Sequence, residues 1–206
     1  MKTNLILQLL KWDLFKMSNV QRYSWTQVII PENLAQHSYY VTVLADLISE
    51  DISERFPNIK IDKKKVLSFA LYHDYEEIYT WDIITPVKYK NKEFREKLDS
   101  LWNLLLTEWI NSNFEWNNHI WSRIKKSYED YEIWKNDLIE SKIVKFADMI
   151  QALWYVIQEV NMWNSYMDSV LKNIIKLIKE RYWDVDEFKI YIENLADAML
   201  DNALLK

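Results

Sequence analysis

Residues 33–54 read NLAQHSYYVTVLADLISEDISE, and this stretch carries a clear helical pattern. Its apolar residues recur three, four or seven positions apart, as on one face of an α-helix: Leu34, Val41, Leu44, Ala45 and Ile48. Asn33 is suited to begin such a helix, because its side chain can accept a hydrogen bond from the first free backbone amides. Pro57 lies just beyond the expected end. The stretch therefore predicts an amphipathic helix from residue 34 to about residue 54.

Similar patterns cover most of the remaining chain. Asp62 is a suitable cap for a second helix that extends to about Tyr79, with Val66, Phe69 and Ala70 facing inward. Loops are expected at 18–32 and 82–89, and further helices at 4–17, 91–112, 117–131, 136–161, 165–181 and 185–204. We see no internal repeat and no linker-like segment. The sequence predicts an all-α helical bundle that forms a single domain over residues 1–206.

The amino-acid composition excludes several classes of function. The 206 residues include no cysteine, so disulfides, thiolate metal ligands and a thiol nucleophile are excluded, and a metal site must use His, Asp, Glu and backbone groups. The net charge of −5 argues against binding of duplex nucleic acid, which requires a basic surface. A small nucleotide stays compatible, since one or two Arg or Lys side chains suffice to hold its phosphate.

The sequence also gives an expectation for the compartment. The apolar stretch near the amino terminus is too short for a signal-peptide core, and no run has the roughly 18 uninterrupted apolar residues of a membrane helix. We therefore expect a cytoplasmic protein without membrane contact.

The chain contains no glycine but 11 tryptophans. Average usage near 7% would give about 14 glycines in a chain of this length. Trp81, Trp163 and Trp183 stand in turn-like contexts where glycine is common. We hypothesise that many of these tryptophans occupy glycine positions, for instance because a codon read as Gly in the source was translated as Trp. A natural, tryptophan-rich protein is the alternative.

Three segments place metal-ligating residue types on apolar helix faces. His37 is in line with Val41 and Leu44, and His73, followed at once by Asp74, continues the inward face of the second helix. Asp148 stands in the apolar stretch IVKFADMI (143–150), where a buried carboxylate must be paired, protonated or metal-bound. Each position alone is more often structural. Three such positions on three helices favour a shared site.

The amino-acid sequence around these positions resembles that of the HD-domain phosphohydrolase superfamily, and in particular that of the YfbR-like 5'-deoxynucleotidases. Residues 32–38 (ENLAQHS) resemble the family's ENVAEHS helix start, and residues 73–89 (HDYEEIYTWDIITPVKY) its HDxxEvxtGDlptPvKy stretch. Residues 145–148 (KFAD) match the last motif. The likeness covers about residues 18–165. Its main departure is Trp81, where the family has glycine.

This resemblance implies a set of site residues. The metal ligands would be His37, His73, Asp74 and Asp148, which together hold one divalent ion through two nitrogen and two oxygen ligands. Such a set suits Mn, Fe, Co, Mg or Zn, so the sequence leaves the metal open. Two acidic residues and three substrate contacts complete the implied site: Glu77 as general acid/base, Asp82 at the sugar or leaving-group side, Arg22 at the phosphate, Tyr23 against the sugar and Lys88 as a second cation.

Three functions follow, in order of preference. The first is hydrolysis of deoxynucleoside 5'-monophosphates to the nucleoside and phosphate. The second is removal of triphosphate from deoxynucleoside triphosphates. The third is a non-catalytic nucleotide-binding regulatory module, against which the intact ligand set and Glu77 argue. The expected partner is a small nucleotide. The sequence leaves the base preference and the oligomeric state open, with a homodimer as one option.

Overall fold

The computed structural model describes residues 13–75, 77–80, 91–114, 119, 122–123, 125–127, 130 and 138–200. Within these residues the secondary structure is helical, and extended pairing is limited to an isolated bridge between Gln21 and Asn33. The all-α prediction is confirmed. The elements in chain order are the 3-10 helix η1 (Asp13–Asn19), α2 (Leu34–Arg55), α3 (Lys63–Tyr72), α4 (Glu77–Thr80), α6 (Lys92–Phe114), α8 (Ile139–Asn161), the 3-10 helix η2 (Ser165–Met167), α9 (Asp168–Tyr182) and α10 (Asp186–Leu200).

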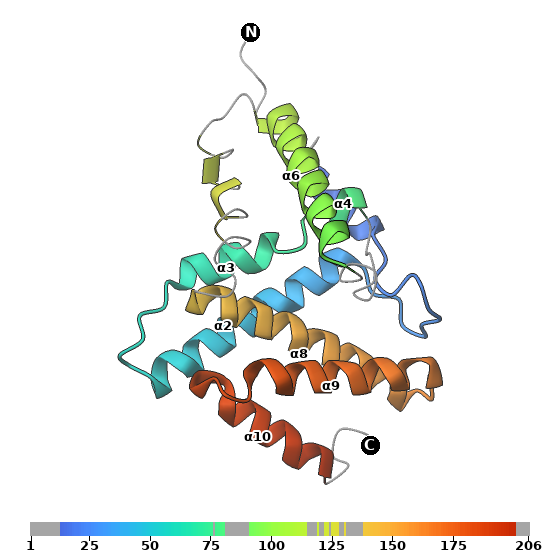
Figure 1. Cartoon of the computed structure of the whole chain (residues 1–206), viewed down its shortest axis with the longest axis vertical. Coiled ribbons are helices and arrows are strands. Elements are labelled where there is room, and N and C mark those ends of the chain that lie inside the picture. The colour runs from blue at the N-terminus through green and yellow to red at the C-terminus, as the bar shows by residue number, and fades with distance from the viewer. Residues whose placement is uncertain are drawn as a thin grey trace.

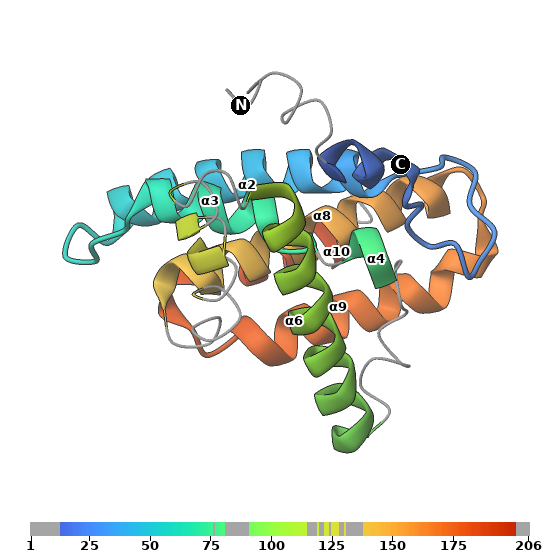
Figure 2. The same ribbon diagram turned by 90° about the horizontal axis from the view of Figure 1, so that it is seen from above.

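Three helices form the centre of the molecule. α2 packs against both α3 and α8, and α3 also contacts α8. α9 covers α8, and α10 contacts α9 at the edge of the bundle (Figures 1 and 2). Each buried aliphatic or aromatic side chain contributes about 1.5–3 kcal/mol by leaving water. The core residues come from all five helices: Val41, Ala45, Ile48, Ile52, Val66, Phe69, Ala70, Ile143, Val144, Phe146, Ala147, Leu153, Ile175, Ile178, Tyr182, Phe188 and Ile192.

Both predicted helix caps are confirmed. The Asn33 side chain accepts a hydrogen bond from the Gln36 amide at 3.0 Å, and the Gln36 side chain accepts one from the Asn33 amide at 3.0 Å. This reciprocal pair is a capping box that fixes the first turn of α2. At α3, the Asp62 side chain accepts from the Lys65 amide at 3.1 Å. Because these bonds span only three residues, the local sequence was enough to predict them.

The helix predicted from Asp62 to about Tyr79 is wrong in its second half. α3 ends at Tyr72, and α4 begins at Glu77 after a turn. In this turn the amides of Tyr75 and Glu77 donate to the carbonyls three residues before them, at 3.2 and 3.0 Å, as in a 3-10 helix. The break directs Tyr75 into the interior, where it is 1% exposed. His73 and Asp74 therefore lie in the turn and not on a continuous helix.

The other predicted elements have mixed outcomes. Helices near 91–112, 136–161 and 185–204 are confirmed as α6, α8 and α10, and the loop at 18–32 is confirmed around the Gln21–Asn33 bridge. The segment 165–181 begins with η2 before α9 starts. Of the amphipathic α-helix predicted at 4–17, the described part is a 3-10 helix. The loop at 82–89 and most of the helix at 117–131 lie outside the described residues.

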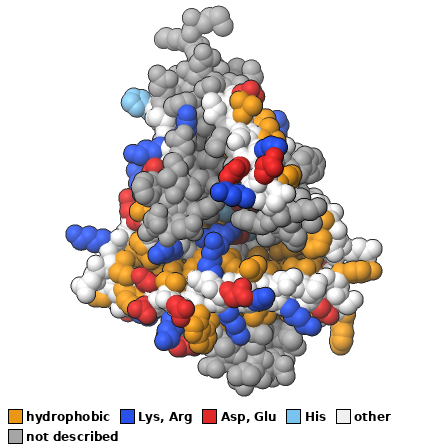
Figure 3. All heavy atoms as spheres, viewed as in Figure 1, with side chains coloured by type: hydrophobic (Ala, Val, Ile, Leu, Met, Phe, Trp, Pro, Cys, Tyr) orange, Lys and Arg blue, Asp and Glu red, His pale blue; other side chains and the backbone are white. Residues whose placement is uncertain are grey.

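Two surface features bear on the expected partners. Acidic and basic side chains lie intermixed with apolar ones on the face shown in Figure 3, in keeping with the modest net charge of −5. Among the described residues, no helix is both long enough and apolar enough to cross a membrane.

Trp163 stands in a conformation that favours glycine. Its φ is 67°, in the left-handed region, and its side chain is 94% exposed. The Trp163 amide donates to the Val160 carbonyl at 2.9 Å, and the Asn164 amide to the Glu159 carbonyl at 3.0 Å. These two bonds form a Schellman motif at the end of α8, in which the left-handed position is usually glycine. Trp183 differs, because its φ of −56° suits any residue. Trp81 lies outside the described residues.

We expect Trp163→Gly to stabilise the protein by about 1 kcal/mol. Glycine removes the cost of left-handed backbone, about 1–2 kcal/mol, and part of this gain is offset by the larger freedom of glycine in the unfolded chain. Few contacts are lost, since the indole is 94% exposed. Urea unfolding of wild type and variant measures the difference. Trp183→Gly is the matched control and should destabilise the protein. A loss of stability in Trp163→Gly would contradict the glycine hypothesis at this position.

The hypothesis as a whole has a separate test. Sequencing of the gene, together with the intact mass of the protein from its native source, counts the tryptophans directly. A mass that fits 11 Trp would refute a glycine origin.

Candidate metal centre

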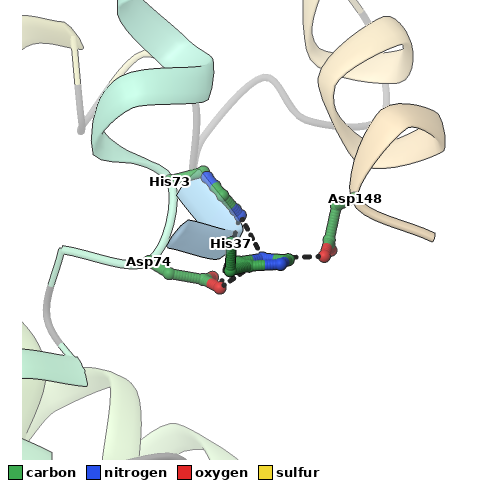
Figure 4. Close-up of side chains that lie close together, drawn as sticks. All are labelled: His37, His73, Asp74 and Asp148. Carbon is green, nitrogen blue, oxygen red and sulfur yellow. Dashed lines mark hydrogen bonds and ion pairs between the residues drawn. The ribbon is translucent and has the colours of Figure 1, made fainter. Parts of the chain in front are cut away.

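Four side chains from three segments converge at one point. His37 comes from α2, His73 and Asp74 from the turn after α3, and Asp148 from α8 (Figure 4). One ligand atom from each lies within 4.8 Å of the ligand atoms of the other three. His37, His73 and Asp148 are 0%, 2% and 9% exposed, and the Asp74 side chain is 20% exposed. The structure thus brings together the four residues that the sequence marked as ligands.

The spacing of these atoms suits a metal ion. His37 Nε2 lies 3.3 Å from His73 Nε2 and 3.4 Å from both Asp74 Oδ2 and Asp148 Oδ1. His73 Nε2 lies 3.3 Å from Asp74 Oδ2. Ligands that surround an ion tetrahedrally at 2.0–2.1 Å are about 3.4 Å apart. Two nitrogen and two oxygen donors at this spacing fit one divalent ion.

The orientation of His73 leaves one ring nitrogen for a metal. His73 Nδ1 lies 2.8 Å from the carbonyl oxygen of Ala70. Because a carbonyl can only accept, Nδ1 carries the proton and donates it. Nε2 then keeps its lone pair and faces the other three ligand side chains. This bond to the last turn of α3 holds the imidazole in the metal-binding orientation.

The charges of the cluster favour a cation at its centre. Burial and Arg22 would lower the pKa of His37, but hydrogen bonds to Asp148 and Asp74 outweigh them and raise it to about 9. Burial would raise the pKa of Asp74, yet His73 and His37 hold it well below its usual value. Lys145 and His37 likewise overcome burial and lower the pKa of Asp148. Both carboxylates are therefore ionised at neutral pH, as metal binding requires.

Two basic side chains flank the cluster. Arg22 Nη1 lies 3.3 Å from Asp74 Oδ2, as expected for an arginine placed beside the metal site. Lys145 Nζ lies 2.5 Å from Asp148 Oδ2. Sequence reasoning did not select Lys145, although its position three residues before Asp148 puts both on one side of α8. The cluster thus has a cation on each side within reach of a bound anion.

Tyr23 stacks on another aromatic ring, and Glu77 is buried near the cluster. The Tyr23 ring stacks on Tyr155 of α8, with centroids 4.9 Å apart and an interplanar angle of 10°. The Glu77 side chain is 2% exposed, and its amide donates to the Asp74 carbonyl, so one tight turn separates it from a cluster residue. A helix that continued to about Tyr79 would place Glu77 one turn beyond His73 on the same face; this expectation is wrong, because α3 ends at Tyr72 and Glu77 begins α4. Asp82 and Lys88 lie outside the described residues.

Comparisons with known proteins give the family and the fold of this chain. Residues 11–199 match the family described as 5'-deoxynucleotidase YfbR-like. A 5'-deoxynucleotidase of Vibrio parahaemolyticus is 26% identical over 171 residues, which cover 82% of this chain and 83% of that protein. An HD-domain phosphohydrolase of Listeria innocua has a TM-score of 0.81 at 22% identity, with 97% of this chain and 92% of that chain covered. The HD phosphohydrolase of cyanophage S-2L, solved with dA and one catalytic Zn²⁺ ion, has a TM-score of 0.59 at 21% identity, with coverage of 89% and 94%.

The helical fold is that of a solved HD-domain phosphohydrolase, and within it two histidines and two aspartates lie at one point. Within this class the chain belongs to the YfbR-like 5'-deoxynucleotidase family, since the family match extends over most of its length. The resemblance seen in the sequence is confirmed.

Proposed function

We propose that this protein hydrolyses deoxynucleoside 5'-monophosphates to deoxynucleosides and phosphate. The observation that carries the proposal is the buried cluster of His37, His73, Asp74 and Asp148 in a chain of the YfbR-like family. These residues would hold one divalent ion, which when bound lowers the pKa of a water molecule and polarises the phosphoryl group. Zn²⁺ is the first ion to test, because a structural neighbour holds one catalytic Zn²⁺; Mn, Fe, Co and Mg stay compatible with the ligand types.

The remaining roles belong to side chains around the cluster. Arg22 binds the phosphate, because a guanidinium can donate two hydrogen bonds to it and already lies beside Asp74. Lys145 is a second phosphate contact from the α8 side. Tyr23 packs against the sugar. Glu77 serves as general acid/base, and Asp82 and Lys88 keep the leaving-group and cation roles that the family resemblance implies.

A product assay tests this proposal. Purified protein is incubated with deoxynucleoside monophosphates, ribonucleoside monophosphates and deoxynucleoside triphosphates, each with Zn²⁺, Mn²⁺, Co²⁺ or Mg²⁺. We expect inorganic phosphate from the deoxynucleoside monophosphates. Faster cleavage of the triphosphates, with triphosphate as product, would establish the second function instead. Nucleotide binding without turnover would establish a regulatory module.

Arg22→Ala should lower kcat/KM for deoxynucleoside monophosphates roughly 10- to 100-fold, since a hydrogen bond to a charged group contributes about 1.5–3 kcal/mol. Triphosphates should be weakened as well, because they share the phosphate next to the metal. Steady-state kinetics measure the effect. Arg181→Ala is the matched control, because Arg181 is exposed in the last turn of α9. Unchanged kcat/KM in Arg22→Ala would remove Arg22 from substrate binding.

The proposal extends to the compartment and the assembly. The cytoplasm supplies nucleotide substrates and is the proposed compartment.

A homodimer is supported by exposed apolar side chains at helical spacing on α2, namely Tyr39, Val43 and Leu47. Trp154 of α8 lies beside this surface, with its ring 5.7 Å from that of Tyr40. Sedimentation analysis of the purified protein measures the assembly, and a strict monomer at micromolar concentration would exclude the dimer.

A further inference from the structure

A chain of buried polar side chains extends from His37 away from the cluster. His37 Nδ1 lies 2.7 Å from Gln151 Oε1, and Gln151 Nε2 lies 2.6 Å from Glu32 Oε1. His37, Gln151 and Glu32 are only 0%, 1% and 4% exposed. Neither Gln151 nor Glu32 belongs to the four clustered residues. Burial of an amide and a carboxylate is costly unless their hydrogen bonds are made, so this arrangement has a strongly preferred geometry.

Each bond in this chain has a fixed direction. An ionised carboxylate can only accept, so Glu32 must face the amide nitrogen of Gln151. The amide oxygen of Gln151 then faces His37 and can only accept. His37 must therefore donate from Nδ1, and its Nε2 is left to face His73, Asp74 and Asp148. The direction of the first bond at Glu32 thus determines which ring nitrogen of His37 is free.

Backbone hydrogen bonds hold Glu32 where it can accept from Gln151. The Arg22 amide donates to the Glu32 carbonyl at 2.9 Å, and the Leu34 amide donates to the Val20 carbonyl at 2.9 Å. These bonds tie the segment before α2 to the loop that carries Arg22. The second carboxylate oxygen, Glu32 Oε2, lies 3.6 Å from Arg22 Nε. Arg22 thus pairs with the same carboxylate whose other oxygen accepts from Gln151.

We propose that Gln151 and Glu32 are positioning residues that hold His37 with its proton on Nδ1 and its Nε2 available to a metal ion. The inference rests on the metal site of the proposed function. His73 receives the same orientation from a backbone carbonyl, whereas His37 receives it from two side chains. The orientation of His37 is therefore open to change by substitution at residues 151 and 32, neither of which is a proposed ligand.

Substitutions at residue 151 distinguish a role in orienting His37 from a role in packing alone. Gln151→Met keeps the size of the side chain but gives His37 no acceptor, and should weaken Zn²⁺ binding roughly 10- to 100-fold. Gln151→Glu combined with Glu32→Gln exchanges the two groups, so that an acceptor still faces His37 and a donor still faces that acceptor, and should bind Zn²⁺ within about threefold of wild type. Gln158→Met is the control, because it makes the same change two turns further along α8, and should have no effect. Competition with a chromophoric chelator measures the Zn²⁺ affinity without any nucleotide, and circular dichroism checks the fold.

Glu32→Ala tests whether Glu32 determines which amide atom of Gln151 faces His37. With Gln151 present, its amide can turn over once Glu32 is gone, so Zn²⁺ affinity should fall several-fold. With Glu at position 151, the acceptor needs no partner to direct it, so Gln151→Glu with Glu32→Ala should bind Zn²⁺ as tightly as Gln151→Glu with Glu32→Gln. Equal losses in both backgrounds would overturn the directing role of Glu32.

A measurement on the unmodified chain covers the case that a variant does not fold. In Zn²⁺-loaded, ¹⁵N-labelled wild type, long-range ¹H–¹⁵N spectra should show His37 with a proton on Nδ1 and the metal on Nε2. A proton on Nε2, or full Zn²⁺ affinity in folded Gln151→Met, would overturn the proposal. If wild type binds none of Zn²⁺, Mn²⁺, Co²⁺ and Mg²⁺, this inference and the metal site both fail. Zn²⁺ binding without nucleotidase activity would overturn the proposed function alone.

Discussion

His73→Ala and Asp148→Ala should each abolish stable metal binding while the helical fold persists. Each change removes one of four ligands, and the three that remain leave one side of the ion without a protein ligand. The core of α2, α3, α8, α9 and α10 does not depend on these side chains, because its contacts are apolar. We expect metal content to fall from about one ion per chain to less than about a tenth, with unchanged circular dichroism.

Metal analysis after loading and desalting measures this result. His119→Ala and Asp184→Ala serve as controls, since both residues are exposed and His119 is the remaining histidine of the chain. Both controls should keep about one ion per chain. Full occupancy in His73→Ala and Asp148→Ala would show that the ligand assignment is wrong.

Glu77→Ala should separate catalysis from metal binding. Glu77 is not one of the four clustered residues, yet it is buried one tight turn from Asp74. A general acid/base contributes roughly 10²-fold or more, so kcat should fall by that factor while metal content stays at wild-type level. Glu77→Gln should lose a similar factor, because the amide keeps the shape but cannot transfer a proton.

Phosphate release and metal content are measured on the same preparations. Glu193→Ala, at an exposed position of α10, is the control for loss of a carboxylate and should be as active as wild type. Near wild-type turnover in Glu77→Ala would remove Glu77 from the mechanism. Loss of the metal in this variant would instead make Glu77 part of the metal site.

Local patterns were enough to predict much of the fold. The start of α2 depends on Asn33 and Gln36, and the start of α3 on Asp62, all through bonds within one turn. The inward face of α3 follows from the spacing of Val66, Phe69 and Ala70. The end of α3 was not predictable in this way, because no proline or glycine marks it. Here the chain turns so that Tyr75 becomes buried, which depends on packing with distant segments.

The site was predictable where its residues carry a recognisable motif. His37 and Asp148 stand on helices and His73 and Asp74 in the turn after α3, all four within sequence motifs that resemble the family's, and the structure brings them together. Gln151 and Lys145 were missed, because a polar residue within a helix usually faces solvent. Both lie three positions from Asp148, and this spacing was the available signal. The partner of Gln151, His37, lies on α2 and becomes apparent only once α2 packs on α8.

The central claim is that one metal ion at His37, His73, Asp74 and Asp148 supports hydrolysis of deoxynucleoside monophosphates. The most direct measurement removes all metal with a chelator and then titrates Zn²⁺ into the protein in the presence of a deoxynucleoside monophosphate. Phosphate release should be absent at the start, rise in proportion to added Zn²⁺ and level off at one equivalent per chain. Undiminished phosphate release from the metal-free protein, or none at one bound equivalent of Zn²⁺, Mn²⁺ or Co²⁺, would contradict the claim.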